Sequence, residues 1–108
     1  MTLTPVTKKS KFFTKKVYQL VSKIPEGKVT TYGYLAKLVN INPRQVGHIL
    51  HLNPDPQKIH CHRVVSARGG VSNNFAFGGP AKQRQLLIRE KVKFKGNKVD
   101  LNFCLWSG

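Results

Sequence analysis

Two short helical patterns separated by a tight turn restrict the fold of this chain more than any other feature. Thr31 can cap the first pattern, whose apolar stripe runs through residues 35–39. Asn42 can cap the second, with Pro43 at the first helical position, where a missing amide hydrogen costs nothing. Apolar residues then follow between 46 and 50. Two helices joined so tightly are typical of a helix-turn-helix.

Two further helices and a flexible arm are predicted around this unit. Apolar residues at helical spacing predict a helix over residues 12–24, and the same spacing predicts a last helix from Pro80 to Val92. Residues 1–11 are polar and basic without an apolar period, so we expect a flexible arm. The helical part of the chain is therefore expected to begin at Phe12.

Short strands complete the expected fold. Residues 64–71 read as a strand followed by a glycine turn, which resembles a small β-wing. Alternating residues around Gly96-Asn97, from Val92 to Leu101, predict a C-terminal β-hairpin, and Trp106 is expected to anchor the tail by packing. We predict a mainly α fold, a small winged helix-turn-helix domain over residues 12–108.

Length and composition fit one small domain. A chain of 108 residues with 40% hydrophobic content can bury a core of its own, but a second domain will not fit. No apolar run approaches the roughly 18 residues that a membrane span needs, and residues 1–11 lack the apolar core of a signal peptide. Two cysteines cannot build a disulfide framework. We therefore expect an intracellular, reducing location.

The charge balance points to a polyanionic partner. Lys and Arg total 19 against 4 acidic residues, which gives a formal net charge of +15. A surface that only needs to be soluble normally mixes both signs, so the excess favours the nucleic-acid backbone. Charge alone does not distinguish DNA from RNA or from an anionic membrane face.

The most reactive stretch is residues 59–65, where Cys61 lies between His60 and His62. The thiolate is the nucleophilic form of cysteine, and basic neighbours are expected to lower the pKa of Cys61 below its free value of about 8.5. His62 could act as the base. Side chains of adjacent residues on an extended strand point to opposite faces, so a bend or a bridging water would be needed between the two.

Two other interpretations of this stretch stay open. A free cysteine followed by two valines is often only core packing, because cysteine is among the most buried residue types. His48, His51, His60, Cys61 and His62 are also potential zinc ligands. Their spacing is not that of a zinc finger, and only Cys104 remains as a second thiol, so we expect no metal.

The same stretch resembles the Pro-Cys-His-Arg-Val motif of the O6-alkylguanine-DNA alkyltransferases. Residues 61–64 match the motif, and His60 replaces its proline. Other family features recur in order from Thr31-Tyr32 to Glu90, so the resemblance covers about residues 12–92. It implies a DNA repair protein that moves an alkyl group from guanine irreversibly to its own cysteine, without a cofactor. The chain is similar to short members of the family, which include alkyltransferase-like proteins.

The resemblance also implies a role for particular residues. Arg44, in the family pattern Arg-x-Val-Gly, would enter the duplex where the damaged base has left, and Tyr32 would help to rotate that nucleotide. Taken alone, without the resemblance, Arg44 is better interpreted as a solvated helix arginine and Tyr32 as a partly buried helix aromatic. The expected catalytic residues are Cys61, His62, Glu90, which would orient His62, and Asn53, which would support the active-site turn; the expected DNA-binding residues are Tyr32, Arg44, Arg63 and Phe75.

The sequence departs from the family in the loop that should meet the lesion. Phe75 and Ala76 stand where the family has a tyrosine and often a serine, so two hydroxyl groups are missing. Three functions remain in view: an active alkyltransferase on double-stranded DNA containing O6-alkylguanine, a non-enzymatic lesion sensor that recruits other repair proteins, and a plain winged-helix DNA binder. The protein is expected to act as a monomer.

Overall fold

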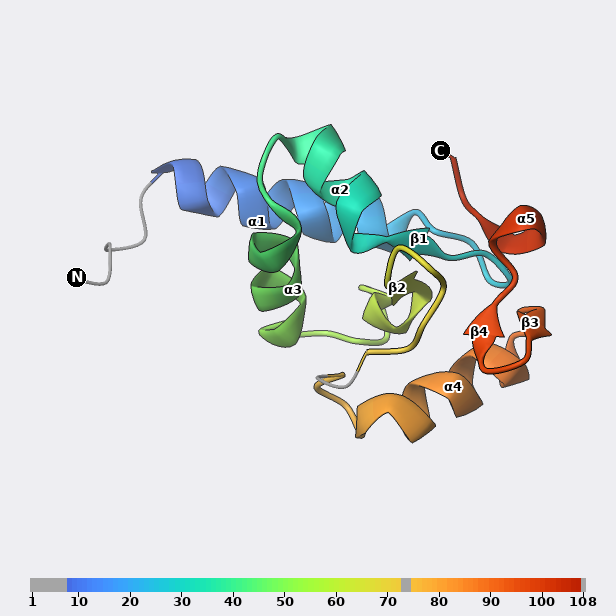
Figure 1. The fold of residues 1–108 in the computed structure, drawn as a ribbon. Coiled ribbons are helices and arrows are strands. Elements are labelled where there is room, and N and C mark those ends of the chain that lie inside the picture. The colour runs from blue at the N-terminus through green and yellow to red at the C-terminus, as the bar shows by residue number, and fades with distance from the viewer. Residues whose placement is uncertain (1–7, 73–74, 108) are drawn as a thin grey trace.

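The computed structural model describes residues 8–72 and 75–107, and five α-helices make up nearly half of this part of the chain (Figure 1). Helices α1 (Lys8–Ser22), α2 (Tyr32–Val39) and α3 (Pro43–His51) pack together in one half of the molecule. Helix α1 begins four residues before the predicted Phe12, so the last part of the predicted arm is helical. Residues 1–7 of that arm lie outside the described residues.

The helix-turn-helix forms through the predicted caps. The side chain of Thr31 accepts a hydrogen bond from the amide of Tyr34, at 3.1 Å. Asn40 ends α2 in the left-handed conformation, with φ of 64°. Asn42 Oδ1 accepts from the amide of Gln45 at 2.8 Å, and Gln45 Oε1 accepts in return from the amide of Asn42 at 2.9 Å. Both predicted helix starts are confirmed.

A parallel pair of very short strands joins the two halves of the molecule. Strand β1 (Thr30–Thr31) pairs with β2 (Val64–Val65), and a 3-10 turn, η1 (Cys61–Arg63), leads directly into β2. This pairing was not predicted. Because the residue that caps α2 belongs to β1, the ladder holds the start of α2 beside the turn that carries Cys61.

The glycine turn after β2 lies against the C-terminal hairpin. The amide of Val99 donates to the carbonyl of Gly69 at 2.9 Å, and a side chain at Gly69, where φ is 88°, would collide with the carbonyl oxygen of Val99. The domain is winged-helix-like as predicted. However, β2 pairs with β1 and not with a strand beyond the glycine turn, and the turn itself packs against the C-terminal hairpin.

The C-terminal half consists of α4 (Gly79–Arg89), the antiparallel hairpin β3 (Phe94–Lys95) and β4 (Lys98–Val99), and α5 (Leu101–Cys104). The hairpin is confirmed. Helix α4 ends earlier than predicted because Lys91 adopts a positive φ of 63°. Helix α5 was not predicted: Asp100, which we expected within a strand, caps it through Oδ1 and the amide of Asn102, at 3.1 Å.

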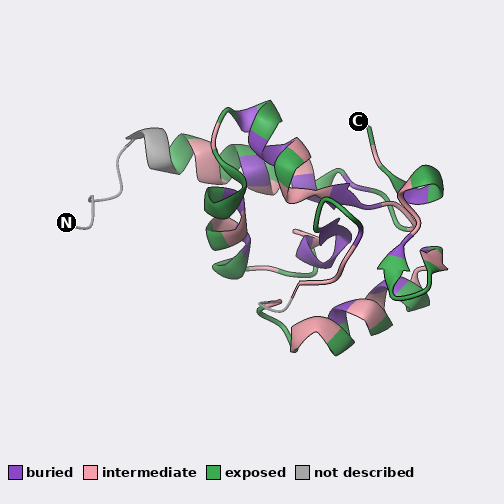
Figure 2. Cartoon of the chain, in the orientation of Figure 1, coloured by how far each residue is buried: buried purple, intermediate pink, exposed green. Residues whose placement is uncertain are grey.

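Two clusters of buried residues hold the fold together, and Figure 2 shows where buried residues lie along the chain. One lies between the first three helices and includes Cys61; the other packs α4 and the hairpin under the strands. Val64 belongs to the first cluster and Val65 to the second, so β2 contributes to both. The amide of Trp106 donates to Val29 at 2.7 Å and its ring packs on the first cluster, as predicted for the tail.

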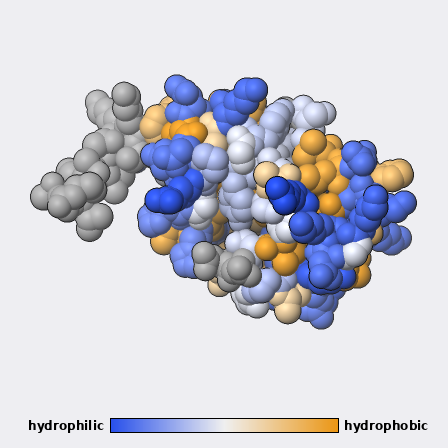
Figure 3. Space-filling view, viewed as in Figure 1, coloured by the Kyte–Doolittle hydropathy of each residue, from blue (hydrophilic) through white to orange (hydrophobic). Residues whose placement is uncertain are grey.

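Hydrophilic side chains cover much of the face seen in Figure 3, with smaller hydrophobic areas between them. Within the described ranges, no helix is both long and apolar enough to cross a membrane.

Candidate functional site

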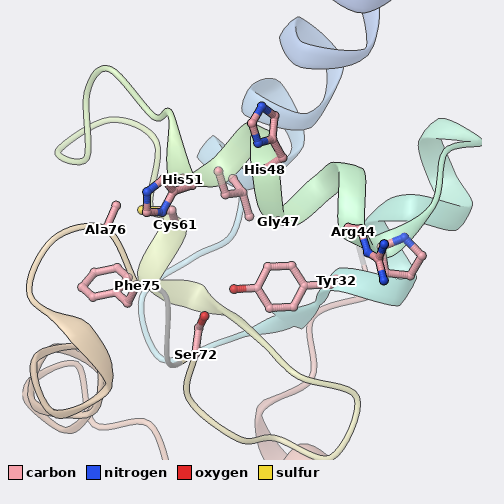
Figure 4. A pocket seen from close by; sticks show the side chains of 11 residues that line it. Tyr32, Arg44, Gly47, His48, His51, Cys61, Ser72, Phe75 and Ala76 are labelled. Carbon is pink, nitrogen blue, oxygen red and sulfur yellow. The ribbon is translucent and has the colours of Figure 1, made fainter. Parts of the chain in front are cut away.

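A cavity of about 650 Å³ lies where the helix-turn-helix, the 3-10 turn and the loop before α4 meet (Figure 4). Helix α3 supplies one wall, Tyr32 supplies another from the start of α2, and Cys61 comes from the turn. The lining residues are Tyr32, Pro43, Arg44, Gly47, His48, Leu50, His51, Cys61, Ser72, Phe75 and Ala76. The structure thus brings together Cys61 and three of the four predicted DNA-binding residues.

Asn53 braces the segment that leads to Cys61. This buried side chain donates through Nδ2 to the carbonyl of Ile59 at 2.8 Å, and its Oδ1 accepts from the amide of Asp55 at 2.9 Å. These two hydrogen bonds hold the loop of residues 53–59 together just before η1 begins. Asn53 is therefore in a position to support the turn, as the resemblance implied.

The environment of the Cys61 thiol differs from the predicted one. The residue is 6% exposed, and burial raises the pKa of its thiol. Hydrogen bonds from the Asn53 side chain and from the backbone amides of Cys61 and His62 lower it only in part. The prediction that histidine neighbours lower this pKa was wrong, because desolvation outweighs every favourable contact with the charged sulfur.

His62 and Glu90 form the predicted contact. The Nε2 atom of His62 lies 2.8 Å from Glu90 Oε2. This hydrogen bond fixes which ring nitrogen faces the carboxylate and leaves Nδ1 for another partner. Residues 61–63 form a 3-10 turn and not an extended strand. This is the bend that the sequence required if the side chains of Cys61 and His62 were to act together. Among the hydrogen bonds of the described residues, none joins the His62 ring directly to the thiol.

Glu90 also holds Arg63. The guanidinium donates from Nε to Oε1 at 2.9 Å and from Nη2 to Oε2 at 2.6 Å, a bidentate pair. Burial alone would raise the pKa of Glu90, but hydrogen bonds from Arg63 and His62 hold it below its usual range. Glu90 follows directly after α4, as its C-terminal cap.

The prediction that Arg63 contacts DNA is corrected by the structure. Its side chain is buried, with 7% of the residue exposed, and its third hydrogen bond runs from Nη1 to the carbonyl of Ile24 at 2.7 Å. Three of the five N–H donors of this buried guanidinium are bonded inside the protein, so it is not placed to contact a phosphate. Arg63 instead connects the turn that carries Cys61 to the segment that follows α1.

Tyr32, Arg44 and Phe75 line the cavity from different sides. In Figure 4, Phe75 and Arg44 lie towards opposite ends, with the Tyr32 ring between them. Burial raises the pKa of Tyr32, and a hydrogen bond with the Ser72 side chain offsets part of that rise. Arg44 is exposed on the first turn of α3, where a long cation can reach outward. The loop at Phe75 and Ala76 offers no side-chain hydroxyl, as expected from the sequence.

Several lining residues were missed. His48 and His51 follow Arg44 by four and seven positions, so helical spacing could have placed all three on one face. Ser72 gave no signal, and neither did Gln83, which is buried but does not line the cavity, because serine and glutamine usually mark loops and surfaces. In the described part of the chain, no three histidine, cysteine or acidic side chains are arranged to hold a metal.

Comparison with known proteins identifies the family. A family model described as 6-O-methylguanine DNA methyltransferase, DNA binding domain, matches residues 12–92. A methylated-DNA–protein-cysteine methyltransferase of Methanocaldococcus jannaschii is 47% identical over 92 residues, which are 81% of this chain and 52% of that protein. The chain thus spans about half the length of this relative.

Two other relatives match over more of their own length. A DNA base-flipping protein of Escherichia coli is 41% identical over 101 residues, covering 88% of this chain and 74% of that protein. The structure of S. pombe Atl1 in complex with damaged DNA containing O6-carboxymethylguanine superposes with a TM-score of 0.77 at 34% identity, over 91% of this chain and 97% of that one. The chain therefore belongs to the family defined by the DNA-binding domain of 6-O-methylguanine DNA methyltransferase.

Proposed function

We propose that this chain is a DNA repair protein that turns an O6-alkylguanine out of double-stranded DNA and transfers the alkyl group to Cys61. The observation that carries this proposal is the placement of the Cys61 thiol in the wall of a cavity that also holds Tyr32, Arg44 and Phe75. A cavity of about 650 Å³ is within the range of small-molecule sites, which run from roughly 300 to 1,000 Å³.

Extrusion of the base is the first requirement. Removing a base from the stack costs a few kcal/mol, so the extruded state needs support from both sides. Arg44 is suited to fill the vacancy in the duplex, because its planar guanidinium can stack and is exposed on α3. Tyr32 and Phe75 offer aromatic faces to the extruded guanine. The net charge of +15 supplies the general attraction to the phosphates.

Transfer is a displacement at the alkyl carbon. The Cys61 sulfur attacks this carbon, the bond from carbon to the guanine O6 breaks, and its electrons remain on the guanine, which takes up a proton. The thiol proton leaves through a water to His62, whose Nε2 is held by Glu90. The products are a thioether on Cys61 and an unmodified guanine. A thioether is a poor leaving group, so each protein molecule acts once and needs no cofactor.

A second function is a lesion sensor that holds alkylguanine without removing it. Two observations favour it. Burial raises the pKa of the Cys61 thiol, which disfavours the reactive thiolate, and Phe75 and Ala76 lack the hydroxyls expected in an alkyltransferase. In that case other repair proteins would complete the repair. Under either function we expect a monomer that acts inside the cell, where the DNA is.

Intact-mass measurement separates the two functions. The protein is incubated with duplex DNA containing one O6-methylguanine, and with the same duplex unmodified. Transfer adds the mass of one methylene per molecule, and peptide mapping places it on Cys61. Cys61→Ser should remain unmodified, whereas Cys104→Ser, the matched control at the other cysteine, should react like the parent. Tight binding of methylated DNA with an unmodified Cys61 after long incubation would establish the sensor instead.

A further inference from the structure

Gln83 is fully buried in α4 and joins three segments that line or support the cavity. Its Nε2 donates to the carbonyl of His62 at 3.0 Å and to the carbonyl of Val64 at 2.9 Å. Its Oε1 accepts from the backbone amide of Ser72 at 2.7 Å. One side-chain amide thus connects the active-site turn, strand β2 and the segment that leads into the loop at Phe75.

These contacts use both donors and the acceptor of the amide. Buried backbone carbonyls need a partner, and an unsatisfied one is costly. The two carbonyls lie on either side of Arg63, so Gln83 fixes the curvature of the chain just after Cys61. A lysine could donate to both carbonyls but could not accept from Ser72; a glutamate could accept but could not donate when ionised.

Ser72 and Cys61 line the same cavity. The hydrogen bonds of Gln83 therefore connect two parts of the cavity wall, in addition to filling the core. The Ser72 side chain also hydrogen-bonds with Tyr32. Gln83 is therefore linked through the His62 carbonyl to the turn that carries Cys61, and through Ser72 to the residue expected to rotate the nucleotide. In Figure 4, Ser72 lies near the hydroxyl end of Tyr32, on the opposite side of the cavity from α3.

We propose that Gln83 is a positioning residue that sets the separation between the Cys61 sulfur and the cavity wall formed by Ser72, Phe75 and Ala76. The inference rests on the proposed alkyl transfer. A displacement needs the reacting atoms about 3–3.5 Å apart, and a displacement of 1 Å can cost on the order of 100-fold in rate. The lesion would still enter the cavity when Gln83 is lost, but the sulfur would meet the alkyl carbon at the wrong distance.

The test compares Gln83→Met with Gln85→Met. Methionine keeps the length of glutamine and removes its hydrogen bonds. Gln85 lies two positions away on the same helix and is exposed, so it is the matched control. Three quantities are measured for the parent and both variants: the dissociation constant for methylated duplex, the single-turnover rate of transfer at saturating DNA, and the rate at which iodoacetamide modifies Cys61 in the free protein.

We expect Gln83→Met to lose on the order of 100-fold in transfer rate, with the dissociation constant and the iodoacetamide rate close to those of the parent. Gln85→Met should match the parent in all three. A merely structural role would loosen the turn and speed the iodoacetamide reaction, or weaken binding in parallel with transfer, and either result overturns the inference.

Gln83→Glu supplies a second criterion. A neutral carboxylic acid can donate to one carbonyl and accept from Ser72, whereas an ionised one can only accept. Its transfer rate relative to the parent should therefore fall as the pH rises, and a ratio independent of pH overturns the inference. Normal transfer by Gln83→Met also overturns it while leaving the proposed function intact. If the parent itself leaves Cys61 unmodified, the proposed function fails, and this inference fails with it.

Discussion

Replacing Glu90 by glutamine tests how much the ion pair between Glu90 and Arg63 stabilises the fold. Glu90 accepts one hydrogen bond from His62 and two from Arg63, at 2.6 to 2.9 Å. Its side chain is 13% exposed and that of Arg63 8%, so solvent screens the pair only weakly. Glutamine has the same shape but no charge, and it offers one oxygen in place of two.

The expected loss of stability follows from these contacts. Glutamine would turn an NH2 group towards a donor, so at least one hydrogen bond to a charged partner is lost, worth about 1.5–3 kcal/mol. The Arg63 cation would remain buried without its anion, and breaking such a pair typically costs about 3–5 kcal/mol. We therefore expect Glu90→Gln to lower the free energy of unfolding by about 3 kcal/mol. For a domain of this size this corresponds to a fall in Tm of about 12 °C.

Urea denaturation at pH 7 measures the difference, with Glu26→Gln as the matched control. Glu26 is exposed, so its replacement should change the free energy of unfolding by less than about 0.5 kcal/mol. The pKa of Glu90 is lower in the folded protein, so its contribution is present above the unfolded value of about 4.3 and disappears as the pH falls through the folded value. The gap between parent and Glu90→Gln should therefore close in acid. A loss below about 1 kcal/mol at pH 7 would contradict an ion pair of this kind.

Four further predictions concern DNA and the thiol. Arg44→Ala should weaken base extrusion, measured by a fluorescent base analogue at the lesion, far more than it weakens overall binding. Arg68→Ala, a change at another exposed arginine, should leave extrusion unchanged. Equal analogue signals for Arg44→Ala and the parent protein would exclude the stacking role. Cys61→Ala should abolish transfer and keep lesion binding, and loss of both would show that the thiol is needed for binding. Because burial raises the pKa of Cys61, iodoacetamide should modify it more slowly in the folded protein than in urea at pH 8, and a faster reaction when folded would contradict the burial. DNA affinity should fall steeply with salt, with a slope of about −0.9 per phosphate contact, and a flat response would exclude phosphate binding.

Features set by neighbouring residues were predictable from the sequence. Thr31, Asn42 and Pro43 act within one turn of their own helices, so their chemistry fixed both helix starts. The hairpin around Gly96-Asn97 is equally local. Asp100 shows the limit of such signals: a capping residue was present, but strand alternation continued through it and hid α5.

Features set by distant residues were not predictable. Arg63 resembles a surface cation in a chain of net charge +15, and its contacts with Glu90 and with the carbonyl of Ile24 turn it inwards. The raised pKa of Cys61 depends on how closely the surrounding elements pack, which the neighbouring histidines do not indicate. Gln83 carries no pattern at all, because its three partners come from other segments.

The pairing of β1 with β2 has a consequence for the order of folding. Helices α2 and α3 follow one another directly, so the helix-turn-helix can form from local contacts. The pairing of Thr30 with Val64 requires closure of the long loop that contains both helices. Closing such a loop costs conformational entropy before any contact across it can form, so non-local pairing is slow. A chain that has folded only its local elements would already have its helix-turn-helix while the turn carrying Cys61 is still open to solvent. On this argument the thiol becomes sheltered only after this long-range pairing has closed.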